Sequence, residues 1–451
     1  MRRLHHDCRR LHHLSWLTVV AGVTVVSIIS GCDAKPTRLE RDILRVVDHY
    51  GGLKGVGDSP NEALRNEVER IRQEGGMPRQ LDEAVVPDEE NLATGLVDLV
   101  KKRRIQSVLE YSEELLPGDW LHFEAPQLEE VRSFLVSHHD ALGQIDAALT
   151  RPRCDFHVQH AAGYFADTRP VEYAVIAGRL KTLEAAVRLH DEGPAAALGP
   201  LRAIFRLAEC LSQEKQVTCR LHAARLRHDA LLVMAAIVAD ERAGQRNVGE
   251  VYELLRQQLD GWAPESDVWI GDRALGMHVY EVVRDGRLAH LLTDTEHDAL
   301  VQEGAEGQFL AAAEANVDGD ELFYLETMRK LIDACDRPSY DRGEVFTEID
   351  EQLGRAEAIG EYPLVAGRML LTNVRRAQET MAADRAMCEV WALALAAALD
   401  VKPPSYSVNP FTGEAYRTDV DDGIVYVYPG MNSAAGGTAP EQPITIRRFR
   451  Q

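Results

Sequence analysis

The residues best able to do chemistry lie in a His- and Cys-rich stretch in the first half of the chain. Cys154, His157 and His160 form a C-x2-H-x2-H pattern, and Asp155 and Asp167 supply carboxylates nearby. Thiolates and imidazoles are ligands that suit zinc or copper. The spacing matches no established zinc module, and ordinary loop packing explains the same residues. The pattern therefore leaves two interpretations open, a metal site and a structural loop.

Two acidic turns resemble cation-binding loops in part. Asp318 and Asp320 lie in a stretch that imitates the first half of a calcium loop, but Leu325 stands where that loop needs a bidentate Glu. Asp419 and Asp421 lie beside an Asp-Gly turn and could also gather a cation. We favour a capped helix start for the first pair and a hairpin turn for the second, with cation turns as the alternative.

The cysteines allow one disulfide to be considered from spacing. Nine residues separate Cys210 from Cys219, about 13.5 Å of rise along one continuous helix, whereas disulfide-bonded Cα atoms lie within about 7 Å. A bridge between them therefore needs a chain reversal, which the polar residues 212–215 could supply. We expect most cysteines after Cys32 to be buried, unbridged thiols. They number five, so at least one is free or paired between chains: Cys154, Cys210, Cys219, Cys335 and Cys388.

No motif in the sequence specifies an enzyme. The chain has no G-x-S-x-G nucleophile motif, no phosphate-binding glycine loop and no H-E-x-x-H zinc motif. Its 451 residues carry a formal net charge of −22, whereas nucleic-acid backbones are bound through Lys and Arg. We therefore predict no nucleic-acid partner and no cofactor, and we expect a protein partner instead.

The amino-terminal segment indicates export. A basic stretch precedes an apolar run, Leu17–Cys32, which ends Ile29-Ser30-Gly31-Cys32. A charged region, an apolar region and small residues before a cleavage point are typical of a secretory signal. The last four residues resemble a bacterial lipobox, which implies a diacylglycerol or acyl lipid on Cys32. The alternative is an uncleaved anchor, but the run is shorter than the ~20 residues that a spanning helix needs.

The elements that must position these residues are predominantly helical. Apolar residues recur at helical spacing, and Pro, Gly and polar turns punctuate the pattern. We expect a mostly α fold, an irregular array of antiparallel helix pairs without a fixed repeat period. The expected helices span 34–51, 60–74, 87–116, 126–149, 170–190, 194–211, 216–241, 247–259, 266–285, 295–315, 320–335, 341–359 and 362–399.

The carboxyl-terminal residues change character after Pro403-Pro404. Alternation at 424–428 predicts a small β-hairpin with 414–418, and Ile444–Ile446 is a candidate edge strand. The predicted organisation is a signal peptide (1–31), an amino-terminal helical segment (32–118), a main α-helical domain (119–400), a β-hairpin appendix packed on that domain (401–430) and a flexible tail (431–451).

Three stretches resemble a family of exported planctomycetal helical proteins. Residues 179–202, continuing to Leu211-Ser212-Gln213-Glu214, resemble the family's paired-helix core, and Arg151–Phe156 resembles the loop before it. Asn409–Arg417 resembles the family's D-P-F-x-G-x-x-L-x-Y ending. Here Asn409 replaces the usual Asp, the tyrosine spacing is shorter and a Y-P-x-x-L-x-x-L segment is missing. The resemblance implies fold and compartment and brings no activity.

The same ending is also similar to the D-P-W-G-x-P-Y segment of major pseudopilins. Pseudopilins begin with an uninterrupted hydrophobic helix, whereas most of this chain lies between its signal and the ending, which argues against pilin-like assembly. We therefore expect a lipoprotein facing the periplasm or cell exterior, membrane-tethered, with a non-catalytic binding or scaffold role at the cell envelope. The alternatives are a metal-binding protein or hydrolase using the Cys154–His160 loop, and a component of a secretion apparatus.

Overall fold

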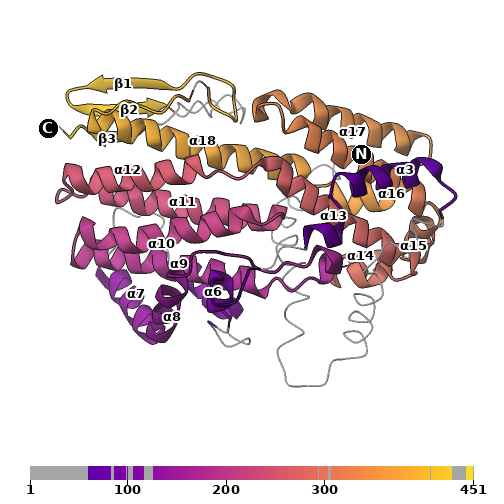
Figure 1. Ribbon diagram of the computed structural model, residues 1–451, viewed down its shortest axis with the longest axis horizontal. Helices are drawn as coiled ribbons and strands as arrows, with labels where there is room; N and C mark the ends of the chain where they lie inside the picture. Colours follow the sequence, from indigo (N-terminus) through magenta and orange to yellow (C-terminus); the bar gives the residue numbers. More distant parts are fainter. Residues whose placement is uncertain are drawn as a thin grey trace.

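Helices dominate the computed structural model, which describes residues 59–82, 86–97, 99, 105–115, 125–292, 294–302, 306–406, 408–428 and 443–449. A small three-stranded antiparallel sheet lies near the carboxyl end (Figure 1). The prediction of a mostly α fold with a small hairpin is confirmed. The expected signal peptide, Cys32 and the expected helix at 34–51 lie outside the described residues.

The helical elements follow one another with short connections. In chain order they are α3 (Glu62–Gln73), α4 (Pro78–Leu81), α5 (Leu92–Gly95), α6 (Ile105–Glu114), α7 (Ala125–Ser137), α8 (His139–Leu149), η2 (His160–Phe165), α9 (Arg169–Asp191), α10 (Pro194–Gln213), α11 (Val217–Ala239), α12 (Gln245–Asp260), α13 (Glu265–Arg284), η3 (Leu288–Leu291), α14 (Asp294–Gln302), α15 (Glu306–Ala315), α16 (Val317–Ala334), η4 (Ser339–Asp341), α17 (Gly343–Ala358), the π-helical turn η5 (Ala366–Leu370) and α18 (Val374–Leu399).

The buried apolar side chains form two clusters. The first hydrophobic cluster is built by α5–α12, the second half of α18 and the sheet. The second hydrophobic cluster is built by α3, α13, α15–α17, η5 and the start of α18. Helices α5 and α6 pack on α8 and α9 within the first cluster. Figure 1 shows α18 running along the molecule, from the sheet at one end towards α17 at the other.

Helix α9 lies at the centre of the first cluster. Almost every residue from Val171 to Ala186 is buried, because α10, α11 and the α6–α8 segment pack around it. Apolar residues lie on all sides of its first half, as expected of a helix that is surrounded by other helices. Gly193, with φ of 98°, ends the helix and lets α10 turn back along it.

The helix predicted over 126–149 is divided into α7 and α8 at His138, and two further predicted long helices are interrupted. The prediction of one helix over 87–116 is wrong, because the buried Asn91 caps α5 and the chain turns again at Leu96. The prediction of one helix over 362–399 is also wrong, since η5 and a turn at 371–373 precede α18. In both cases apolar spacing continues across the break, so periodicity alone could not reveal it.

The sheet consists of β1 (Arg417–Asp421), β2 (Ile424–Tyr428) and β3 (Ile444–Arg447), in that spatial order. Asp422 and Gly423 both have positive φ, as a two-residue hairpin turn requires. Val425, Val427 and Ile446 are buried, and β2 and β3 pack on α18. The edge strand is confirmed, so residues 444–447 belong to the sheet and not to a flexible tail.

None of the described helices combines the length and the apolar character needed to cross a membrane.

Candidate functional site

The three predicted metal ligands of the 154–160 loop have separate partners. The Nδ1 atom of His160 lies 2.8 Å from a carboxylate oxygen of Asp82, and its Nε2 atom lies 3.2 Å from the carbonyl oxygen of Lys215. The ring of His157 contacts Asn91, at 3.2 Å, and the neighbouring Asp155. Within the described ranges, no group of three or more His, Cys, Asp or Glu side chains is arranged to hold a metal ion.

The loop instead joins distant parts of the chain. Asp82 accepts hydrogen bonds from the backbone N–H groups of His160 and Ala161, which fixes the start of η2. Burial opposes ionisation of Asp82, but the hydrogen bonds from His160 and Ala161 outweigh it and lower the Asp82 pKa. On the other side, Asn91 donates to the carbonyl of Asp155. These contacts fit the structural interpretation of the loop.

The second pair of predicted site residues remains on the surface. Asp419 and Asp421 are exposed on β1, opposite Tyr426 and Ile424 of β2. The Asp422-Gly423 turn that follows them closes the hairpin.

Cys210 and Cys219 are both buried free thiols. The chain does reverse between them, since α10 ends at Gln213 and α11 begins at Val217. The thiol of Cys219 lies 3.6 Å from the side-chain oxygen of Gln216, whereas Cys210 is the group that most raises the pKa of the Cys154 thiol.

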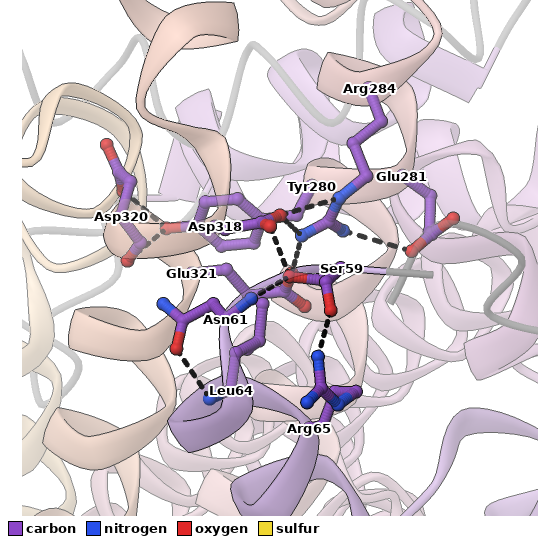
Figure 2. Close-up of polar contacts among 10 residues, drawn as sticks. All are labelled: Ser59, Asn61, Leu64, Arg65, Tyr280, Glu281, Arg284, Asp318, Asp320 and Glu321. Atoms are coloured by element: carbon purple, nitrogen blue, oxygen red, sulfur yellow. Dashed lines mark hydrogen bonds and ion pairs between the residues drawn. The ribbon is translucent and has the colours of Figure 1, made fainter. Parts of the chain in front are cut away.

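Asp318 and Asp320 take part in a buried polar network (Figure 2). Both lie in the first turn of α16, where the sequence predicted a helix start. Asp318 accepts hydrogen bonds from the hydroxyl of Ser59, ahead of α3, and from the guanidinium of Arg284 on α13, the latter at 2.7 Å. The network therefore ties three elements of the second cluster together.

Arg284 is the base at the centre of this network. It forms ion pairs with Glu281 at 3.1 Å, with Asp318 and with Glu321, whose side chain is fully buried. Burial raises the pKa of Glu321 to about 7, although the nearby Arg284 acts in the opposite direction. We call Tyr280, Glu281, Arg284, Asp318, Asp320 and Glu321 the buried carboxylate network.

Asp320 connects this network to the π-helical turn. Its carboxylate accepts a hydrogen bond from the hydroxyl of Tyr280 at 2.7 Å. It also accepts the backbone N–H groups of Val365 and Ala366, at 2.9 and 2.8 Å. Burial raises the pKa of Asp320 against the effect of these donors. Turns with π-helical geometry are frequent at functional sites.

The chain leaves η5 along the wall of a groove. This α17–α18 groove has a volume of about 430 Å³, within the range of ligand-binding pockets. Phe346, Ile349, Leu371 and Val374 form its apolar floor and are largely buried. The full set of lining residues is Phe346, Ile349, Asp350, Leu353, Leu371, Thr372, Asn373, Val374, Arg375, Arg376 and Glu379.

Charged side chains of both signs surround the groove. Asp350 of α17 and Arg375 of α18 form an exposed ion pair at 2.7 Å between the two helices. The guanidinium of Arg375 also lies over the ring of Phe346, 5.3 Å from its centroid. Arg376 and Glu379 add further exposed charges. The arrangement combines an apolar floor with a polar rim.

The sequence alone did not indicate this groove or the α13 part of the network. Tyr280, Glu281 and Arg284 are polar residues that lie among buried apolar residues in the last turns of α13. That contrast was the available signal, but it does not identify their partners on α16. The groove arises from two helices and a turn whose packing is not encoded in any local motif.

The carboxyl-terminal motif is a structural turn. Asn409 is fully buried, and its side-chain oxygen accepts the backbone N–H groups of Phe411 and Thr412, at 2.7 and 3.2 Å. Gly413 follows with φ of 76°. An Asp at this position would offer the same acceptor oxygen. Tyr416 then donates its hydroxyl to Glu389 of α18 at 2.8 Å.

Comparisons with protein-family models, curated proteins and solved structures give no match to this chain.

Proposed function

We propose that this chain is an exported lipoprotein, held at a membrane by acyl lipid on Cys32, that binds a segment of a partner protein in the α17–α18 groove. The sequence of the amino-terminal segment supports the tether. Binding without catalysis is supported by the groove, which offers apolar contact and charge.

The observation that carries the proposal is the apolar floor of the groove beneath charges of both signs. Binding energy at protein interfaces is concentrated in a few apolar anchors that enter desolvated pockets, surrounded by a polar rim. A volume of about 430 Å³ accommodates such an anchor. The matching partner segment carries one or two large apolar side chains flanked by charged residues.

The rim can exchange its own contacts for those of a partner at low cost. Asp350 and Arg375 are both more than one-third exposed, with relative side-chain exposures of 67% and 44%. Exposed ion pairs contribute only about 0–1 kcal/mol. A partner carboxylate can therefore replace Asp350 beside Arg375 without a large loss of stability.

The wall of the groove is fixed before a partner arrives. The buried Asp320 holds the first backbone N–H groups of the segment that leads through η5 to Leu371. Fixing a binding surface in advance reduces the entropy lost on binding. The buried carboxylate network thus supports the proposed site without contacting the partner.

The test places a charge in the groove. Leu353 is a half-buried residue of α17 at its edge, and Leu353→Glu buries a carboxylate under any apolar anchor. Val136→Glu is the matched control, because Val136 is an apolar residue of α7 with 76% exposure. Both full-length variants and the wild type are cross-linked in their native membranes and recovered for quantitative mass spectrometry.

The proposal expects a protein that is recovered with the wild type and with Val136→Glu but is lost with Leu353→Glu. The purified partner should then bind the full chain in solution with the same preference. Equal recovery with all three chains, or loss with Val136→Glu as well, would exclude the groove as the binding site.

A further inference from the structure

An extended stretch of the 150s loop runs alongside α10 and is attached to it at two points. Arg206 of α10 donates to the carbonyl oxygen of Pro152 at 2.7 Å. Glu214, just after α10, accepts the backbone N–H of Phe156 at 2.9 Å. The two contacts fix both the direction and the register of the loop against the helix.

This register brings two cysteines together. Two residues of extended chain advance about 6.6 Å, and four residues of α-helix advance about 6.0 Å. Cys154 lies midway between Pro152 and Phe156, as Cys210 lies midway between Arg206 and Glu214. Residues four apart share one face of a helix, so Cys210 points to the side on which the loop lies.

The electrostatics of the two side chains are consistent with this register. The nearby Cys210 thiol, together with burial, raises the pKa of the Cys154 thiol. Cys210 is 2% exposed, whereas Cys154 is half-buried. The backbone of Arg153 is itself paired with residues 90 and 92, at 3.1 and 2.8 Å, so the loop holds Cys154 in place.

We propose that Cys154 and Cys210 form a disulfide in the exported protein. The proposal rests on the export included in the proposed function, because disulfides persist in oxidising compartments. It replaces the pairing of Cys210 with Cys219 that spacing suggested. The bond would lock the 150s loop, and with it the contacts to Asn91, onto α10.

A protein disulfide of an envelope thiol oxidoreductase is the oxidant. The thiolate of Cys154 attacks one of its sulfurs, which gives a mixed disulfide and releases the other as a thiol. The thiolate of Cys210 then attacks the Cys154 sulfur, forming the internal bond and releasing the second thiol of the oxidoreductase. Two electrons and two protons pass to the oxidoreductase. Because packing raises the pKa of the Cys154 thiol, its thiolate forms more readily before the chain has folded, so the exchange takes place during folding.

The test maps the thiols of the full chain isolated from its native membranes. Thiols are blocked with N-ethylmaleimide during denaturing lysis, and the chain is digested without reductant. We expect one cross-linked peptide pair containing Cys154 and Cys210, about 2 Da lighter than the two reduced peptides together. Reduction, Cys154→Ser and Cys210→Ser should each lower the melting temperature by about 5 °C. Cys335→Ser is the control and should retain both the cross-link and the melting temperature.

The intact mass of the chain shows whether Cys32 is acylated. It therefore distinguishes failure of the disulfide proposal from failure of the proposed lipid tether. Maleimide on both Cys154 and Cys210 in a chain acylated at Cys32 overturns the disulfide and leaves export intact. A bond between Cys210 and Cys219 also overturns it. If Cys32 carries no lipid, the purified chain is refolded in a glutathione redox buffer. Absence of the Cys154–Cys210 bond under those conditions would contradict the claim that the two cysteines are placed to form a disulfide. Partner recovery at the groove is a separate readout that neither cysteine variant should change.

Discussion

Two buried ion-pair networks, one in each hydrophobic cluster, differ in the number of carboxylates that one arginine faces. In the first cluster, Arg227 of α11 faces Asp384 of α18 at 2.5 Å, and both side chains are almost fully buried. In the second cluster, Arg284 alone forms ion pairs with three carboxylates, those of Glu281, Asp318 and Glu321. The first arrangement pairs one base with one acid, whereas the second has an excess of acids.

The difference predicts that the stability of the second cluster depends on pH near neutrality. The buried ion pair of Arg227 and Asp384 joins one positive and one negative charge between α11 and α18. An excess of buried carboxylates lets one of them keep a proton near neutral pH, and Glu321 has its pKa raised to about 7 by burial. The second cluster also carries η5 and the α17–α18 groove. We infer that the buried carboxylate network both stabilises the second cluster and supports the proposed site.

The largest loss of stability should come from removing Arg284, the cation that three carboxylates share. Arg284→Met leaves buried carboxylates without a cation, which typically costs about 3–5 kcal/mol. The loss should be greater at pH 8 than at pH 5, because Glu321 is protonated at the lower pH. Urea denaturation at both pH values measures it. The same loss at pH 5 and pH 8 would show that Glu321 does not titrate in this interval.

Glu321→Gln should remove a pH dependence of stability. The folded chain holds the Glu321 proton up to a pH of about 7, whereas the unfolded chain releases it near pH 4.3. The folded state therefore binds more protons between these values, and this contribution to stability is lost as the pH rises through 7. The free energy of unfolding of the wild type, relative to Glu321→Gln, should fall by about 3 kcal/mol between pH 4 and pH 8. A constant difference would contradict the raised pKa.

Asp320→Asn should loosen the wall of the groove. An amide keeps one acceptor oxygen and adds N–H donors, so a backbone donor of Val365 or Ala366 loses its partner. We expect a loss of about 2 kcal/mol, the cost of a buried unsatisfied group. Hydrogen exchange of the backbone amides at 365–371 should accelerate, while that of α9 should not. Unchanged exchange at 365–371 would mean that Asp320 does not hold this segment.

The smallest effect on stability should come from the rim. Asp350→Asn removes the exposed ion pair with Arg375 and should change the free energy of unfolding by less than about 1 kcal/mol. It is the isosteric control for Asp320→Asn, since one carboxylate is exposed and the other is 3% exposed. A loss as large as that of Asp320→Asn would contradict the distinction between rim and network.

The sequence predicted the helices and strands more accurately than the contacts between their side chains. It predicted the helices on both sides of Gly193, a hairpin closed at Asp421-Asp422-Gly423 and the edge strand at 444–446, because these depend on local periodicity and turn chemistry. It placed the first hairpin strand at 414–418, whereas β1 spans Arg417–Asp421. It placed Asp318 and Asp320 at a helix start. It could not assign Tyr280 and Arg284 as their partners, since that depends on which faces of α13 and α16 meet.

The cysteines show the same limit. Spacing along the chain pointed to Cys210 and Cys219, which lie on consecutive helices. The proposed pairing of Cys154 with Cys210 depends on the register of the 150s loop against α10. The side chains of Arg206 and Glu214 set this register through hydrogen bonds to the backbone of the loop. The linear pattern around Cys154 carries no trace of that register.

The most direct test of the account is the affinity of the recovered partner for the purified full-length chain. Titrations would compare the wild type, Leu353→Glu and Val136→Glu at one pH and salt concentration. The account predicts that Leu353→Glu weakens binding by at least about tenfold, the effect of losing one apolar anchor, whereas Val136→Glu leaves it unchanged. Equal affinity of all three chains would contradict the assignment of the α17–α18 groove as the binding site.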